Sequence, residues 1–256
     1  MLLAVDAGNT QTVVGLLETD GGELVHHWRI STNADRTADE LGLLVSQMVE
    51  AAGCERTMVT GAVVSSTVPR VQTALREMVD RWFGAPLVVV EPGVRTGVPI
   101  LYDGPVGADR IANAVAAVAH HGAPAIVVDF GTATTFDVIS AKGEYLGGVI
   151  VPGIEISLDA LYTHASLLRR VELVEPRGVI GRSTVESIQS GVLYGYAEMA
   201  DGLCRRIQDE LGPCMVVGTG GLSALMVPYA QAIEHHDPWL TLRGLGIIFD
   251  RNRGTT

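Results

Sequence analysis

Two similar segments, half a chain apart, constrain the fold of this chain most strongly. In each, a run of apolar residues ends in an aspartate, a turn of small residues follows, and a second β-rich run comes after it. The segments span residues 2–17 and 125–139, and sliding one onto the other aligns Asp6 with Asp129, Gly8 with Gly131 and Thr12 with Thr135. Internal repeats of this kind predict repeated structural units. We therefore expect two related domains whose aspartate-tipped hairpins face one site.

The composition is that of a globular protein without a membrane span. Of the 256 residues, 47 % are apolar and 18 % are charged, which is enough to bury one large core or two ordinary ones. The apolar runs are too short to cross a bilayer. Met1 leads directly into a strand pattern, without the basic segment of a secretory signal, and the three cysteines lack metal-binding spacing. We expect a cytoplasmic protein.

The charged residues exclude several functions. A net charge of −11 argues against nucleic acid as a partner, because such binding needs a basic surface. Lys142 is the only lysine, and it lies in the turn Ala141-Lys-Gly-Glu144. A Walker A loop needs a lysine after its glycines, and a protein kinase needs one on a strand beside the phosphates. An ATP site in this chain must therefore have a different architecture.

The order of the expected elements repeats once along the chain. In the first half the pattern predicts strands at 2–6, 12–17, 24–30, 61–65 and 87–90, a turn at Asp20-Gly21-Gly22, and helices over 37–53 and 71–82. In the second half it predicts strands at 125–129, 133–139, 145–150 and 215–217, and helices over 107–121, from 154, over 183–211 with glycine interruptions, after 221, and over 240–252. This alternation is typical of an α/β fold with a mixed sheet in each half.

A segment rich in Pro and Gly, residues 91–106, separates the two halves. Such loops often carry functional residues because they have no packing role. Gly107-Ala-Asp-Arg110 then opens a helix. We place the domain boundary at this point, which gives domains 1–106 and 107–256.

Three turns could bind phosphate groups. Asp6-x-Gly8-Asn9-Thr10 and Asp129-x-Gly131-Thr132 each place backbone N–H groups and hydroxyls beside a carboxylate that can reach a phosphate-bound Mg²⁺. The alternative is an ordinary turn whose polar side chains satisfy the local backbone, but two copies in similar hairpins favour the phosphate interpretation. Gly218-Thr-Gly-Gly221, between a strand and a helix, is a third candidate, facing phosphate or adenosine. The chain lacks the G-x-G-x-x-G pattern of a Rossmann fold.

Together these turns resemble those of the actin, sugar-kinase and heat-shock ATPase superfamily. Within it, the chain is similar to type III pantothenate kinases along nearly its whole length. The matching segments are 6–10, 91–97, 107–110, 129–132, 147–153, 181–184 with 189–191, and 237–245. The resemblance implies a ribonuclease H-like duplication, with two βββαβαβα domains, each with a five-stranded mixed sheet, around a cleft. It also implies phosphorylation of pantothenate by ATP to 4′-phosphopantothenate, the first step of coenzyme A synthesis.

The family's site residues carry over onto positions of this sequence. The resemblance implies that Asp109 is the general base, consistent with a helix start, where the dipole favours a carboxylate. It assigns K⁺ or NH₄⁺ to Asp129, and an indirect Mg²⁺ role to Asp6. The implied ATP contacts are Asp6, Ala7, Gly8, Asn9, Thr10, Gln11, Thr12, Val13 and Thr132. The implied pantothenate contacts are Tyr102, Gly107, Ala108, Asp109, Arg110 and Thr184, although the spacer after Tyr102 is shorter than is usual in the family. A homodimer is implied as well.

Two other functions remain open from the sequence. One is another small-molecule kinase or phosphatase of the same superfamily, since a fold does not fix a substrate. The other is a non-catalytic regulatory relative, in which loss of Asp6, Asp109 or Asp129 would be expected, although all three are present. Three His-His pairs, at 26–27, 120–121 and 235–236, are interpreted as solvent-exposed, because adjacent side chains on a strand or helix point apart.

Overall fold

The computed structural model describes residues 1–19, 22–165 and 168–253, so Asp20 and Gly21 of the expected turn lie outside the described residues. By its internal contacts the chain divides into two compact units, Met1–Ala116 with Leu240–Thr256, and Ala117–Trp239. Nowhere in the described residues is a helix long and apolar enough to cross a membrane.

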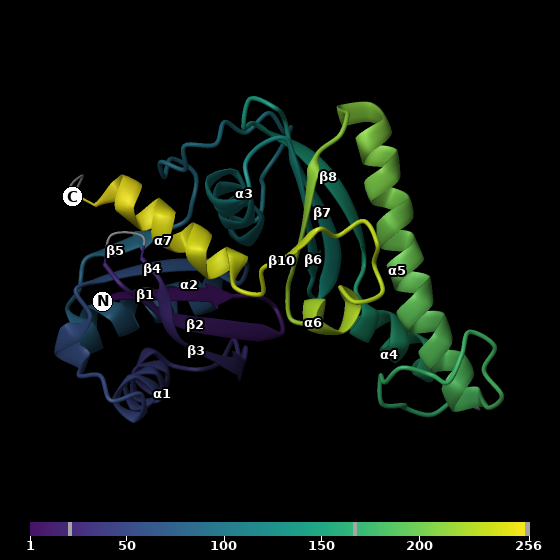
Figure 1. Ribbon diagram of the computed structural model, residues 1–256. Coiled ribbons are helices and arrows are strands. Elements are labelled where there is room, and N and C mark those ends of the chain that lie inside the picture. Colours follow the sequence, from purple (N-terminus) through teal and green to yellow (C-terminus); the bar gives the residue numbers. More distant parts are fainter. Residues whose placement is uncertain (20–21, 166–167, 254–256) are drawn as a thin grey trace. The chain divides into compact units, whose positions relative to one another are not determined.

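The first unit is built on a five-stranded mixed sheet with the order β3-β2-β1-β4-β5 (Figure 1). Its strands are β1 (Leu2–Ala7), β2 (Gln11–Leu17), β3 (Leu24–Ser31), β4 (Gly61–Ser66) and β5 (Leu87–Val89). The first three strands are antiparallel neighbours, whereas β4 runs parallel to both β1 and β5. The parallel crossovers place the ends of β1 and β4 at the same edge of the sheet.

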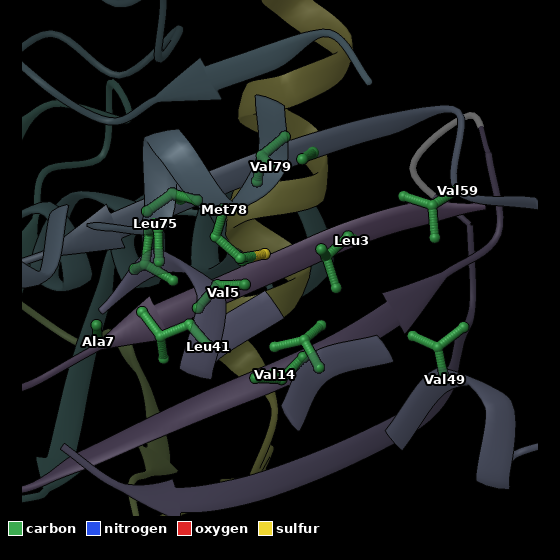
Figure 2. Packing of buried hydrophobic residues seen from close by; sticks show 14 of the residues in the cluster. Leu3, Val5, Ala7, Val14, Leu41, Val49, Val59, Leu75, Met78 and Val79 are labelled. Carbon is green, nitrogen blue, oxygen red and sulfur yellow. The ribbon is translucent and has the colours of Figure 1, made fainter. Parts of the chain in front are cut away.

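Helices α1 (Ala38–Ala51) and α2 (Pro69–Met78) supply apolar side chains to a core with one face of this sheet. Side chains at alternate strand positions, such as Leu3, Val5 and Ala7, join that core, as Figure 2 shows. The predicted capping box at Thr37 is confirmed, because its side chain and that of Glu40 each accept the other's backbone N–H. Pro69 begins α2 at a position that suits proline. After α2 the chain forms a π-helix, Val79–Phe83, which the sequence pattern did not separate from the helix.

The last helix, α7 (Leu240–Asn252), packs against β1, β2 and β4 of the first unit, as Figure 1 shows in yellow. Its close approach depends on glycines in the strands. A Cβ on Gly15 would lie 2.8 Å from Leu242 Cδ1, and one on Gly61 would overlap the ring of Phe249. Helix α7 also approaches α3 (Ala108–His120), where Gly244 lies against the carbonyl of Ala112 and Thr241 donates to Asn113 Oδ1 (2.8 Å). Helices α3 and α7 thus pack together at these residues.

The sheet of the second unit has the order β8-β7-β6-β9-β10, which repeats the strand order of the first sheet. Its strands are β6 (Ala125–Phe130), β7 (Ala133–Ile139), β8 (Tyr145–Pro152), β9 (Met215–Thr219) and the two-residue β10 (His235–His236), which was not expected. Here too the first three strands are antiparallel, and β9 runs parallel to β6 and β10. The expected α/β duplication with two mixed five-stranded sheets is confirmed.

The second unit's core combines this sheet with α4 (Ile154–His164), α5 (Thr184–Leu211) and the short α6 (Ser223–Met226). The expected glycine interruptions do not break α5, which is continuous through Gly191, Gly195 and Gly202. The unit boundaries drawn from contacts assign the start of α3 and all of α7 to the first unit. We still propose 1–106 and 107–256 as the two duplicated halves, because contact units and repeated sequence units need not coincide.

Candidate active site

The first predicted site residue, Asp6, lies near the end of β1 beside the end of β4. Ser65 is its direct neighbour in the parallel register, and the Ser65 hydroxyl donates to Asp6 Oδ1 at 2.5 Å. This length is typical of a hydroxyl that donates to an ionised carboxylate. Ser65 is fully buried, so its hydroxyl holds the Asp6 carboxylate in a fixed position.

The residues after Asp6 form the tip of the β1–β2 hairpin. Asn9, Thr10 and Gln11 are exposed there, and Gly8 N–H donates to Gln11 O (3.0 Å). The side chains of Ala7 and Thr12 are buried, and Thr12 Oγ1 bonds Thr32 Oγ1 (2.8 Å). A ligand at this tip would thus meet backbone groups and the side chains of the three exposed residues.

The second predicted cluster lies at the start of α3. Asp109 is in the first turn, and its Oδ1 accepts the backbone N–H of Arg110 at 2.9 Å. A Cβ on Gly107 would overlap that same Oδ1, so only glycine leaves room for the carboxylate in this position. Ala108 is buried, whereas Asp109 and Arg110 are half-buried. The structure thus brings three of the predicted substrate residues, Gly107, Asp109 and Arg110, into one compact turn.

The segment that leads to this turn is held by the end of α7. Asn252 accepts the Arg95 N–H through Oδ1 (3.1 Å) and donates to the Arg95 carbonyl through Nδ2 (2.9 Å). Arg251 donates to the carbonyl of Thr96. Tyr102, further along the same segment, has a side chain that is 41 % exposed. Tyr102 therefore lies partly at the protein surface.

Asp129 lies in the second hairpin at the same place in its sheet as Asp6 in the first. Its parallel neighbour on β9 is Thr219, and the next residue, Gly220, has a φ of +98°. A Cβ on Gly220 would overlap Asp129 Oδ1 and would lie 2.6 Å from Phe130 N. The predicted glycine-rich turn after β9 therefore packs directly against the Asp129 carboxylate.

Thr132 forms the tip of the β6–β7 hairpin, next to Gly153. A Cβ on Gly153 would overlap the Thr132 carbonyl and would lie 2.6 Å from that of Gly131. Gly153 is also the residue that precedes α4. The absence of a side chain there keeps the hairpin tip and the start of α4 in contact.

The two hairpins differ by one residue, which corrects one aligned pair. Three residues, 8–10, join β1 to β2, whereas only 131–132 join β6 to β7. Ala7 therefore pairs with Thr12, but Phe130 pairs with Thr134. The counterpart of Thr12 is Thr134, not Thr135 as ungapped alignment suggested, and both side chains are buried.

Thr184 is the first residue of α5 and is exposed. Ser183 caps the helix by accepting the Glu186 N–H (3.2 Å), and Glu186 Oε2 accepts the Arg182 N–H (2.9 Å). Gly181 lies against the backbone of Ser187, where a Cβ would not fit. These bonds fix the backbone around Thr184.

Two of the three histidine pairs do not meet the expectation of solvent exposure, because His26 and His121 are each only partly exposed. The His121 side chain is only 16 % exposed, with Nε2 3.8 Å from Asp237 Oδ2 and its ring centroid 5.2 Å from that of His235. Burial lowers the His121 pKa, although the Asp237 carboxylate opposes the shift. The prediction failed at His121 because packing of the end of α3 near β10 is not visible in a local pattern.

The side chains available to bind Mg²⁺ suit an ion whose other ligands are phosphate oxygens. Among the described residues no group of three or more His, Cys, Asp and Glu side chains could hold a metal ion. Mg²⁺ in kinases is commonly bound by one or two carboxylates together with substrate phosphates. A single ordered carboxylate such as Asp6, beside an exposed turn, fits that mode.

Sequence reasoning did not single out three residues that shape these turns. Ser65 was assigned only to a strand, Gly153 only to a matching segment, and Gly220 only to a glycine-rich turn. The available signal was a polar or glycine residue where a strand ends. What each residue touches depends on the order of strands in the sheet, which local patterns do not report.

Comparison with known proteins identifies close relatives along the whole chain. The family model described as type III pantothenate kinase matches residues 2–206. A type III pantothenate kinase of Acidothermus cellulolyticus is 53 % identical over 256 residues, covering 98 % of this chain and 99 % of the relative. One of Myxococcus xanthus is 54 % identical over 258 residues, covering 100 % of both chains.

Solved structures with low identity share the fold. Component A of the (R)-2-hydroxyglutaryl-CoA dehydratase of Acidaminococcus fermentans has a TM-score of 0.55 and 13 % identity, covering 98 % of this chain and 99 % of that one. An inorganic polyphosphate/ATP-glucomannokinase from Arthrobacter sp. strain KM has a TM-score of 0.50 and 15 % identity, covering 98 % and 97 %. At such identities the likeness concerns the fold alone.

Proposed function

The chain belongs to the type III pantothenate kinase family, and from this membership we propose which of its residues carry the reaction. The protein is a kinase that uses ATP to phosphorylate pantothenate, in coenzyme A biosynthesis. Phosphoryl transfer depends mainly on positioning and on neutralisation of charge.

Asp109 is the general base in this proposal, and its position at the start of α3 is the observation that carries the assignment. Its Oδ1 is oriented by the Arg110 N–H, and the proton would pass to the carboxylate from the pantothenate hydroxyl. As the hydroxyl oxygen bonds to the γ-phosphorus of ATP, the bond from that phosphorus to the ADP oxygen breaks. A base must lie within hydrogen-bond reach of the proton it removes. Gly107, Ala108, Arg110, Tyr102 and Thr184 would hold the substrate in that position.

The β1–β2 hairpin would bind the triphosphate. Its exposed side chains, Asn9, Thr10 and Gln11, and the backbone of Asp6 to Val13 offer donors for phosphate oxygens. Thr132 would make a similar contact from the second hairpin. Since Lys142 is the only lysine, backbone groups and bound cations must supply most of the neutralising charge. Mg²⁺ on the phosphates would supply part of this positive charge, with Asp6 in an indirect role toward the ion.

Asp129 would bind a monovalent cation, K⁺ or NH₄⁺. In support, the Gly220 turn packs against one side of its carboxylate, where a side chain on Gly220 would not fit. Oxygen ligands suit alkali cations of this size, as in filters built from carbonyl oxygens. We also propose the cytoplasm as the location, since ATP is the phosphate donor and Cys54, Cys204 and Cys214 are all free thiols.

A homodimer would bury an apolar surface near the start of α5. Val174, Val179, Ile180 and Val185 are exposed by 45 %, 70 %, 88 % and 47 %. Clusters of exposed apolar side chains commonly mark protein–protein interfaces. Light scattering after size exclusion should give the mass of two chains, and Ile180→Asp should favour the monomer. A wild-type mass of 27.1 kDa would contradict the dimer.

The experiment that tests the function is a direct assay. Purified protein with ATP, Mg²⁺ and K⁺ should convert pantothenate to 4′-phosphopantothenate with one ADP formed per product. A panel of sugars and acetate, assayed under the same conditions, should give no product. Turnover of a sugar in preference to pantothenate would overturn the assignment.

A further inference from the structure

The turn that follows β9 is in direct contact with Asp129. Gly220 packs on the Asp129 carboxylate at a φ of +98°, and the N–H of Leu222 donates to the Phe130 carbonyl at 3.1 Å. The conformation of this turn therefore sets the space on one side of the carboxylate. Whatever holds the turn in place also influences what Asp129 can bind.

The turn is held by Ser223, whose side chain is almost fully buried. Its Oγ lies 2.7 Å from the Gly220 carbonyl oxygen and 2.9 Å from His236 Nε2. A carbonyl can only accept, so the single hydroxyl hydrogen of Ser223 goes to Gly220. His236 Nε2 must then carry a hydrogen and donate it to Ser223 Oγ. The Nε2–H tautomer of His236 is the one that satisfies both bonds of the Ser223 hydroxyl.

His236 lies on β10, the strand parallel to β9. In the register of the two strands its partner is Gly218, and the next backbone bond joins Asp237 N–H to the Gly218 carbonyl (2.9 Å). The sheet therefore fixes where the imidazole lies relative to the turn. A chain of hydrogen bonds runs from His236 on β10 through Ser223 to the Gly220 carbonyl. Gly220 in turn packs against the Asp129 carboxylate without a bond between them.

We propose that Ser223 and His236 are positioning residues, which hold the Gly220 turn against Asp129 and thereby set the affinity of its monovalent cation. The inference rests on the proposed cation role of Asp129. Neither residue is assigned a contact with pantothenate or with the reacting phosphorus. They should therefore affect the concentration of K⁺ that is needed, and not the rate at saturating K⁺.

The test compares Ser223→Ala, His236→Phe and His236→Gln with the wild type. Gln keeps an N–H donor, so it should largely rescue the bond that Phe removes. His235→Phe, on the same strand but without the bond to Ser223, is the matched control. Two quantities are measured: the K⁺ concentration for half-maximal activity, and the rise in Tm on replacing NaCl by KCl at constant ionic strength.

We expect Ser223→Ala and His236→Phe to raise the half-activating K⁺ concentration about tenfold, as the loss of one partly buried hydrogen bond implies. The rate at saturating K⁺ should stay within about twofold, and the K⁺-specific rise in Tm should shrink in parallel. His236→Gln and His235→Phe should stay close to the wild type. Because His236 is exposed, its variants should fold even if Ser223→Ala does not.

Three results would overturn the inference, and the first of them would also overturn the proposed cation role of Asp129. If the wild type is equally active in Na⁺ and K⁺ and gains no K⁺-specific stability, the cation role of Asp129 fails together with the inference. If the wild type depends on K⁺ but His236→Phe leaves the half-activating concentration unchanged, only the positioning role fails. A lower rate at saturating K⁺ with an unchanged K⁺ requirement would also contradict it.

Discussion

The Asp109 carboxylate folds back over Gly107, so that a Cβ on Gly107 would overlap Asp109 Oδ1. The same oxygen accepts the N–H of Arg110. The position of the proposed base is therefore set by two neighbours, one that donates a hydrogen bond and one that has no side chain. A side chain added at Gly107 should therefore act on catalysis through Asp109.

Gly107→Ala should displace the Asp109 carboxylate and lower kcat roughly 100-fold, because small misplacements of catalytic groups are costly. Binding of ATP, measured by calorimetry, should remain within about threefold of the wild type. Gly202→Ala is the matched control, since a Cβ there meets only the far end of Arg205 at 3.8 Å. Unchanged kcat in Gly107→Ala would show that the base is not constrained by this contact.

Asp109→Asn should abolish turnover, since an amide cannot take the proton of the pantothenate hydroxyl. The effect expected for the loss of a general base is about 10²–10⁴-fold in kcat. Asn is close in shape, so the fold and ATP binding should persist, and circular dichroism and calorimetry would report both. Near-normal activity in this variant would exclude Asp109 as the base.

Ser65→Ala should weaken the ATP site by releasing Asp6. A hydrogen bond to a charged group contributes about 1.5–3 kcal/mol, which corresponds to a rise of about 10- to 100-fold in the KM for MgATP. Ser46→Ala is the control, because Ser46 is a buried serine of the same unit whose Oγ has no hydrogen-bond partner in the described structure. Equal KM values for the two variants would argue against a role of Ser65.

Replacing K⁺ by Na⁺ at constant ionic strength should remove most of the activity if Asp129 binds a monovalent cation. Asp129→Asn should raise the K⁺ requirement at least tenfold, because a neutral amide loses the charge attraction. Asp209→Asn is the control, because it removes the same charge at an exposed position of α5. Equal rates in both salts would exclude a cation at Asp129.

Cys204 should resist alkylation in the folded protein. Burial raises its pKa to about 12, from 9.0, so at pH 8 only about one part in 10⁴ is thiolate. Mass spectrometry after iodoacetamide treatment should show label at Cys54, which is half-buried, before Cys204. Because the pKa of Cys204 is raised, the protonated thiol contributes fully to the free energy of unfolding below pH 9. This contribution is lost as the pH rises toward about 12. Rapid labelling of Cys204 at pH 8 in the native state would contradict its burial.

Much of the fold could be predicted from local patterns. The apolar runs, the capping box at Thr37 and the glycine-rich turns predicted the main strands and helices of both sheets, because these signals depend on residues close in sequence. The two-residue β10 and the π-helix carry no such signal. The partial burial of His121 depends on Asp237, more than a hundred positions away along the chain, and no periodicity reports it.

For the candidate site, the sequence alone determined the identities of the acidic residues and the turns that hold them. The duplication of the aspartate-tipped hairpin is a property of residue order, and so is the resemblance that assigned Asp109, Asp6 and Asp129 their expected roles. Family membership rests on the sequence in the same way. These conclusions need only residue types at fixed spacing.

Only the tertiary structure decided what surrounds each carboxylate. Ser65 reaches Asp6 from 59 residues away, and Gly220 reaches Asp129 because β9 lies beside β6 in the sheet. The one-residue difference between the hairpins, which moves the counterpart of Thr12 to Thr134, became visible only in the strand pairing. The physical reason is the same in each case, since strand order and register place residues together that no local pattern can pair.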